Sequence, residues 1–211
     1  MKFAAIIPVL AVSLAMSSAL AAGQAVGQDP EADAGPTGHL IEKGSVAVDG
    51  RAVAYLIRRL PVTSFPQLPP EIAEHLTQRG CSIPQTYQAH RPENVVRASL
   101  EQAGSSDWAV LCAAQGSVSL LVFFASAPER PVVLATAEEK QRLQVHDLTG
   151  VMGFNWGIDP ASPREVREAQ AAMAHRPPLL DHDALAETVI NQRTVYHFFA
   201  KDRWTTLEMP E

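Results

Sequence analysis

The sequence contains little cysteine, few aromatic residues and fewer basic than acidic residues. Only two of its 211 residues are cysteine, aromatic residues make up 6%, and 17 Lys and Arg stand against 23 Asp and Glu, which gives a net charge of −6. An acidic chain lacks the basic surface that nucleic acid or an anionic membrane requires. We therefore expect no nucleic-acid partner.

Common catalytic and cofactor motifs are also absent. The chain has no Gly-x-Ser-x-Gly, Ser-x-x-Lys or His-Glu-x-x-His motif, no Walker loop and no Cys-x-x-Cys pair. Since catalytic groups are defined by their arrangement in space, this does not exclude an enzyme. It does leave nothing that implies a cofactor or a metal, and we expect neither.

The N-terminus has the layout of a secretory signal peptide. Lys2 supplies one positive charge, an apolar run occupies residues 3–14, and small residues continue to Ala21. A retained membrane anchor is the alternative, but the run is shorter than the roughly 20 apolar residues of a bilayer span, and no later run reaches that length. We predict a signal peptide over residues 1–22, cleaved after Ala21 or Ala22, no membrane span, and a periplasmic or extracellular protein.

The composition then changes twice along the chain. Residues 23–38 are mostly Ala, Gly, Gln, Asp, Pro and Thr without periodicity, which predicts a flexible leader. Apolar residues make up 46% of the whole chain and charged residues 19%, as in ordinary globular proteins. Residues 39–211 are therefore predicted to form one folded domain.

The two cysteines, Cys81 and Cys112, both lie in this domain. In an exported chain, such a pair without Cys-x-x-Cys spacing favours a structural disulfide. It would close a loop of about 30 residues and stabilise the fold by roughly 3 to 4 kcal/mol on the chain-entropy model. Two buried thiols or one reactive thiol are the alternatives.

Periodicity and turn residues predict both strands and helices. Asp49-Gly50 between two apolar runs indicates a hairpin, and a second hairpin is expected at Lys201-Asp202. Helices are predicted from Pro70 to about Arg79, and from the Ser-x-x-Glu capping box at Ser162 to about His175. Four short β-prone runs separated by tight breaks predict an antiparallel meander: residues 95–100, 108–113, 117–125 and 132–135.

The Gly-punctuated segment 150–160 is interpreted as a loop. Residues 120–124 are apolar on both faces, so they should form a central strand that is covered on each side. The predicted fold class is α+β: an antiparallel sheet, made of the meander and the hairpins, covered by two or three helices.

Several segments together resemble a known set of sequences. The segments are Gly80–Gln85, Pro92–Val96, Asp107–Cys112, Leu120–Phe123 and the closing stretch from Tyr196 to Trp204. They resemble a set of exported bacterial proteins of unassigned function that share the pattern GCxIPQ, PENV, DWAVLC and LLVF. The resemblance covers the middle third and the end of the chain. It implies no activity, ligand or catalytic residue, and favours one domain in which both cysteines are built-in parts.

Two places are weak candidates for a site. His182 and Asp183, with His175 nearby, combine imidazole and carboxylate, which together bind zinc or perform acid–base catalysis. The alternative is that an aspartate beside His182 caps a helix that starts at Ala184. Trp156 in the predicted loop offers a flat face to a sugar or peptide, or else anchors the loop to the core.

The sequence contains no feature that favours an enzyme over a binding protein. We interpret the chain as a non-enzymatic binding or inhibitory module of the periplasm or cell surface, whose partner is a protein, peptide or glycan of the cell envelope. The alternatives are a hydrolase with a site assembled from distant His and Asp residues, and a structural or assembly partner in the envelope. A cleft in which His and carboxylate converge would favour the hydrolase.

Overall fold

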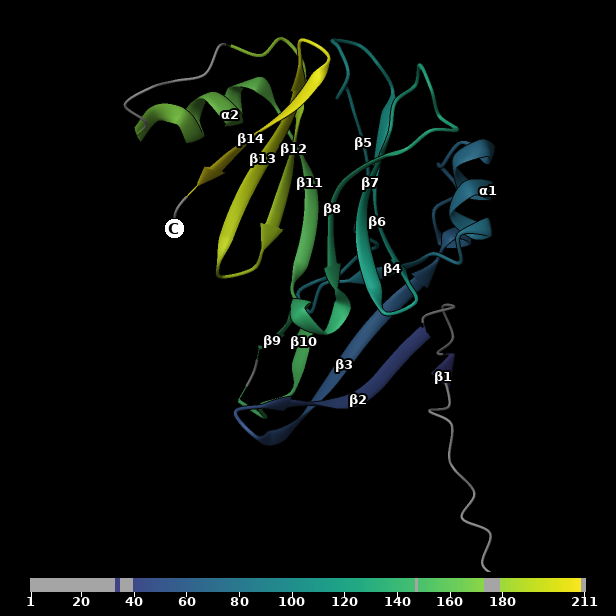
Figure 1. Ribbon diagram of the computed structural model, residues 1–211, viewed down its shortest axis with the longest axis vertical. Coiled ribbons are helices and arrows are strands. Elements are labelled where there is room, and N and C mark those ends of the chain that lie inside the picture. The colour runs from purple at the N-terminus through teal and green to yellow at the C-terminus, as the bar shows by residue number, and fades with distance from the viewer. Residues whose placement is uncertain (1–32, 35–39, 147, 173–178, 210–211) are drawn as a thin grey trace, which may run out of the picture.

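The computed structural model describes residues 33–34, 40–146, 148–172 and 179–209, and it contains two packed β-sheets (Figure 1). The larger sheet has ten strands in the order β1-β2-β3-β4-β6-β7-β8, with β5 beside β6 and β10 between β3 and β9. Because β10 runs parallel to β3, this sheet is mixed. The strands are β1 (Asp33–Ala34), β2 (Leu40–Val48), β3 (Arg51–Pro61), β4 (Ser82–Gln85), β5 (Val95–Ala98), β6 (Asp107–Ala114), β7 (Ser117–Phe123), β8 (Val132–Glu138), β9 (Leu143–Val145) and β10 (Met152–Phe154).

The smaller sheet is a four-stranded antiparallel sheet in the order β11-β12-β13-β14. Its strands are β11 (Trp156–Ala161), β12 (Ala184–Val189), β13 (Arg193–Ala200) and β14 (Arg203–Met209). The main hydrophobic core draws side chains from both sheets, for example Leu111 and Leu120 from the larger and Trp156 and Leu185 from the smaller. The fold is therefore held together chiefly by one sheet packing on the other.

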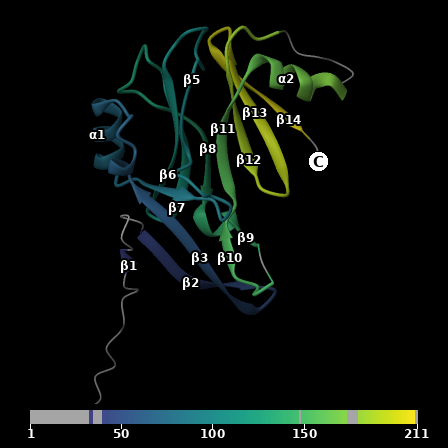
Figure 2. The same cartoon turned by 180° about the vertical axis from the view of Figure 1, so that it is seen from behind.

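Two α-helices occur in the described residues, α1 (Pro70–Gln78) and α2 (Pro163–Ala169), and they lie on opposite sides of the molecule (Figures 1 and 2). Ile72 and Leu76 of α1 pack on the larger sheet, in a cluster that includes both cysteines. Val166 of α2 packs with Phe198 and the end of the smaller sheet. Three short 3₁₀ turns also occur in the described part of the chain: η1 (Val62–Ser64), η2 (Glu139–Arg142) and η3 (Gln170–Ala172).

The predicted α+β fold, a single antiparallel sheet covered by two or three helices, is wrong. Segment 150–160, interpreted as a loop, contains β10 and most of β11, and the helix considered at Ala184 is strand β12. These strands supply the second sheet, which covers the first in place of helices. Helix α1 packs against the larger sheet and α2 against the end of the smaller sheet, and strands make up most of the regular structure in the described residues.

Other local predictions are confirmed. Asp49 and Gly50 have positive φ angles at the β2–β3 turn, and Lys201 and Asp202 have them at the β13–β14 turn. The helix at Pro70 ends at Gln78, and the capping box at Ser162 is present, although α2 ends earlier than expected. Strand β7 is central and buried on both faces, as expected of residues 120–124.

The predicted disulfide is confirmed. Cys81 follows α1 and is bonded to Cys112 on β6. Both residues are buried, in the cluster beneath α1. The bond therefore ties the end of the helix to the middle of the larger sheet. No helix of the described ranges is both long enough and apolar enough to cross a membrane, while the predicted signal peptide and leader fall on residues that lie mostly outside those ranges.

Asn94 links the two sheets. Its side chain is 2% exposed and donates from Nδ2 to the carbonyl oxygens of Pro84 on β4 (2.7 Å) and Trp156 on β11 (3.3 Å). Its Oδ1 accepts from the amide of Ile158 (3.1 Å), and its φ of 68° lies in the left-handed region that Asn tolerates better than most residues. One side chain thus satisfies backbone groups of both sheets.

We expect Asn94→Ala to lower the free energy of unfolding by about 2 to 4 kcal/mol, because three buried hydrogen bonds are lost. Asn191→Ala is a matched control, because Asn191 also has a positive φ but is exposed. Urea unfolding of both variants measures the difference. Equal losses would show that backbone strain, and not the side-chain bonds, accounts for the cost.

Candidate functional site

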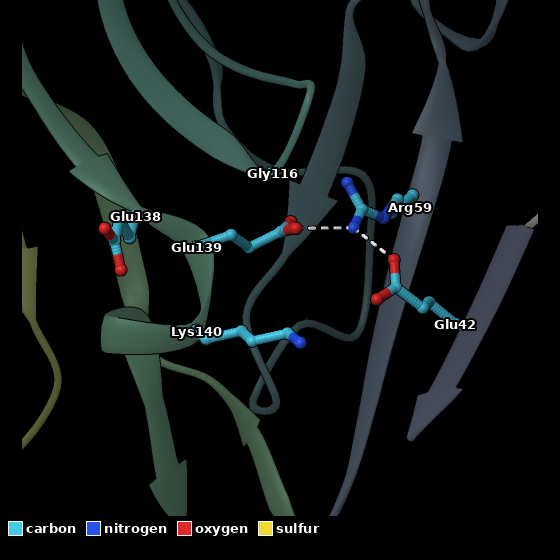
Figure 3. Close-up of a pocket in the computed structure, with 6 residues that line it drawn as sticks. All are labelled: Glu42, Arg59, Gly116, Glu138, Glu139 and Lys140. Atoms are coloured by element: carbon cyan, nitrogen blue, oxygen red, sulfur yellow. Dashed lines mark hydrogen bonds and ion pairs between the residues drawn. The ribbon is translucent and has the colours of Figure 1, made fainter. Parts of the chain in front are cut away.

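A cleft of about 290 Å³ lies where charged residues from distant parts of the larger sheet meet (Figure 3). We call it the Arg59 cleft. Arg59 comes from β3, and its neighbours come from β2, from the β6–β7 turn, from the end of β8 and from η2. The lining residues are Glu42, Arg59, Gly116, Glu138, Glu139 and Lys140.

Arg59 is held between two carboxylates. Its Nη2 donates to Glu139 Oε2 at 2.6 Å and also to Glu42 Oε2, while its Nη1 donates to Ser82 Oγ at 3.3 Å. The Arg59 side chain is 14% exposed. Figure 3 shows the guanidinium between the two carboxylates. Three of the five N–H groups of the guanidinium therefore have acceptors within the protein.

Glu42, whose side chain is 38% exposed, has a partner on its other oxygen as well. Tyr55 on β3 donates its hydroxyl to Glu42 Oε1 at 2.8 Å. Burial raises the pKa of Tyr55 to about 12, with further contributions from the hydrogen bond and from the negative charges of Glu42 and Glu139. Gly44 lies opposite Tyr55 in the β2–β3 register, and a Cβ there would be 2.6 Å from the Tyr55 oxygen. A glycine is thus needed for this arrangement.

Glu139 is different, because only one of its carboxylate oxygens has a partner. The residue is 4% exposed, and its backbone amide donates to the carbonyl of Gly116 at 2.9 Å, which fixes η2 against the β6–β7 turn. Oε2 accepts from Arg59, but Oε1 is buried and has no donor among the described residues. Burial raises the pKa of this carboxyl, against the opposing effect of the Arg59 charge. The cleft therefore contains a buried acceptor in need of a donor.

Lys140 is the second cation that lines the cleft. Its side chain is exposed, and its positive charge has a small lowering effect on the pKa of Glu139. In Figure 3 its amino group extends below the Glu139–Arg59 pair. Glu138 lies apart from that pair and accepts a hydrogen bond from Gln141 Nε2 at 3.3 Å. The cleft is thus lined by three carboxylates and two cations.

His182, a candidate from the sequence, lines another cleft of about 320 Å³. Its Nδ1 lies 2.7 Å from Asp181 Oδ1, and its Nε2 lies 2.8 Å from the carbonyl oxygen of Phe199. The hydrogen bond from His182 lowers the pKa of the Asp181 carboxyl. Because both ring nitrogens of His182 have partners, neither is directed at a ligand in this arrangement.

Asp183 has a different role from its neighbour. Its carboxylate accepts from the amide of Ser99 at 3.0 Å, and its own amide donates to the Ser99 carbonyl at 2.9 Å. These bonds tie the start of β12 to the end of β5. The carboxylate of Asp183 is therefore bonded to Ser99 and not to His182. His175 lies outside the described residues. Within the described ranges no group of three or more His, Cys, Asp or Glu side chains is arranged to hold a metal ion.

Trp156, the candidate for ligand binding, belongs to the core. It is on β11 and is 0% exposed, with the guanidinium carbon of Arg142 4.4 Å from its ring centroid. The loop that should have presented it is a strand, so its ring faces the other sheet. The alternative interpretation, anchoring by burial, agrees with this position.

The residues of the Arg59 cleft were not identified from the sequence. Arg59 and Glu139 are 80 positions apart, and Glu42 is 17 positions from Arg59. The one local signal is that Arg58 and Arg59 directly follow the mostly apolar run 52–57 of the same strand, and a charge buried there needs a partner. Comparison of the chain with protein-family models, with curated proteins and with solved structures finds no match.

We expect the stability of the protein to fall between about pH 10 and 12 because of Tyr55. Its hydroxyl ionises near pH 10 in the unfolded chain but near 12 in the folded protein, so the folded state holds the proton longer and loses stability as the pH rises. Urea unfolding at about pH 9 and at about pH 11.5 measures the fall in the free energy of unfolding between these pH values. We expect this fall to be smaller for Tyr55→Phe than for wild type, by up to about 2 kcal/mol. Tyr196→Phe controls for the loss of a hydroxyl, and parallel pH profiles for wild type and Tyr55→Phe would contradict the assignment.

Proposed function

We propose that this protein is a non-enzymatic binding module that works outside the cytoplasm, and that the Arg59 cleft is its ligand site. The observation that carries the proposal is the unpartnered Oε1 of Glu139, which is buried at the wall of the cleft. An unsatisfied buried acceptor costs about 1 to 3 kcal/mol, and more when it is charged. A ligand that donates to this oxygen recovers part of that cost.

A purely structural role explains the cluster less well. Buried ion pairs often contribute little net stability, because removing both charges from water offsets their attraction. A strut between β3 and η2 would also need only one carboxylate, yet Arg59 holds two. The third hypothesis, a structural or assembly partner in the envelope, therefore has no specific support in the cleft.

The hydrolase alternative is supported less than binding. A general base needs a nitrogen or oxygen within reach of the substrate. His182 has both ring nitrogens engaged, and Asp183 is bonded to the backbone of Ser99. These two candidates are thus tied to the protein itself, whereas Glu139 keeps one oxygen without a donor among the described residues.

The proposed location rests on the disulfide and on the N-terminal sequence. Structural disulfides persist in oxidising compartments and are rare in the reducing cytosol. The Cys81–Cys112 bond is compatible with a periplasmic or extracellular site, and the predicted signal peptide of residues 1–22 would direct the chain there.

N-terminal sequencing of the native protein tests this part of the proposal. We expect the purified chain to begin at Ala22 or Gly23 and to be recovered from the extracytoplasmic fraction. The physical reason is that small residues at the end of the apolar run fit the signal peptidase site. Recovery of a chain that still starts at Met1 would refute it.

A titration followed by amide NMR tests the cleft as a ligand site. The probes are capped tripeptides with a central Lys or a central Glu, and the disaccharide diacetylchitobiose. We expect at least one probe to shift the amides of Gly116, Glu139 and Lys140, and Glu139→Gln to weaken that binding about tenfold, since a charge-assisted hydrogen bond is lost.

The matched control is Glu129→Gln, which removes the same charge from an exposed position in the β7–β8 connection. It should bind the probe as wild type does. The proposal fails if no probe at saturating concentration moves the three cleft amides, or if Glu139→Gln and Glu129→Gln behave alike.

A further inference from the structure

We propose that the ligand of the Arg59 cleft is a primary ammonium group, carried by a lysine side chain or by a small aliphatic amine. This inference rests on the proposed function and names the chemical class that the cleft accepts. It follows from the sign of the charge in the cleft, from the number of free acceptors and from the size of the space.

The charges of the cleft select a cation. Three carboxylates and two cations line it, and the guanidinium of Arg59 already donates to Glu42, Glu139 and Ser82. An anionic ligand would have to approach three carboxylates, with the Lys140 ammonium and the two remaining N–H groups of Arg59 as its donors. The net charge of the whole chain, −6, attracts cations as well.

The free acceptors select an ammonium group over a guanidinium group. Glu139 has a single free oxygen, Oε1, because Oε2 is occupied by Arg59. A guanidinium is a rigid planar fork with five donors and is best matched by a carboxylate with both oxygens free. An ammonium is a compact charge with three donors, which Glu139 Oε1 and the carbonyl of Gly116, two acceptors on the same wall of the cleft, can share.

A neutral hydroxyl ligand is a poorer match than an ammonium. It would donate to Glu139 Oε1 but would leave the excess negative charge of the cleft uncompensated. Hydrogen bonds between an ionised donor and an ionised acceptor are roughly twice as strong as neutral ones. The volume of about 290 Å³ is at the low end of ligand sites, which suits one side chain or a small amine.

Lys140 acts as a resident competitor in this account. Its own ammonium is exposed, extends toward the space below the Glu139–Arg59 pair, and interacts electrostatically with Glu139 (Figure 3). An incoming ammonium must therefore work against a like charge. Removing that charge should strengthen the binding of a cation, and should leave an uncharged ligand unaffected.

Isothermal titration of the full mature protein tests the inference with four probes. They are the capped tripeptide Gly-Lys-Gly, the same peptide with Nε-acetyllysine, the peptide with Arg in place of Lys, and n-butylamine. We expect the lysine peptide to bind at least about tenfold more tightly than the acetylated and arginine peptides, because only it carries an ammonium. If n-butylamine binds as well, a free amine is sufficient as the ligand. If the lysine peptide binds and n-butylamine does not, the ammonium group must be carried by a peptide.

Three variants locate the binding. Glu139→Gln should weaken the lysine peptide about tenfold, Lys140→Met should strengthen it about two- to fivefold, and Glu129→Gln should leave it unchanged. Lys140 is exposed, so Lys140→Met keeps the test valid even where Glu139→Gln disturbs folding. Amide spectra and urea unfolding check that each variant is folded.

The outcomes separate this inference from the proposed function. Equal binding of the acetylated peptide, or weaker binding by Lys140→Met, overturns the ammonium assignment. If diacetylchitobiose or the glutamate peptide binds the cleft and the ammonium probes do not, the inference fails while the cleft stays a ligand site. If no probe binds in a way that depends on Glu139, both fail.

Discussion

The ion pair between Arg59 and Glu139 is the constraint on which the geometry of the site depends. It joins the β2–β3 hairpin to η2, two segments 80 positions apart in sequence, and both side chains are mostly buried. Burying these charges is costly unless each finds a partner. The fold meets that need by placing Glu139 against the β6–β7 turn, where its amide bonds to Gly116, so that its carboxylate reaches Arg59.

The two carboxylates around Arg59 differ in a way that gives the cleft its chemistry. Glu42 is satisfied on one oxygen by Arg59 and on the other by Tyr55, whose place depends on the absence of a side chain at Gly44. Glu139 is satisfied on one side only. The same cluster thus contains one carboxylate that fixes the hairpin and one, in the wall of the cleft, whose buried Oε1 has no donor among the described residues. The proposed binding role rests on this asymmetry and not on the count of charges.

The sequence predicted the local elements better than the way they assemble. The turn at Asp49-Gly50 and the capping box at Ser162 depend on neighbouring atoms alone, and both predictions hold. The disulfide was predicted from the oxidising compartment of an exported chain, and it is present. The second sheet was missed because Gly157 and Pro160 read as loop residues. Among the described strands, β11 lies at the edge of its sheet and pairs with β12 alone, and an edge tolerates a proline without an amide to donate. The cleft was missed because no local pattern relates Glu42, Arg59 and Glu139.

The central claim is that Glu139 is a buried carboxylate with one unsatisfied oxygen. Carbon-detected NMR titration of the Glu139 carboxyl in the free protein, and again in the presence of the capped lysine peptide, tests it directly. Burial should place the pKa of Glu139 above the ordinary value for glutamate in the free protein, and a bound ammonium should lower that pKa. A pKa of Glu139 that is already ordinary or low in the free protein, and that the peptide does not change, would contradict the account.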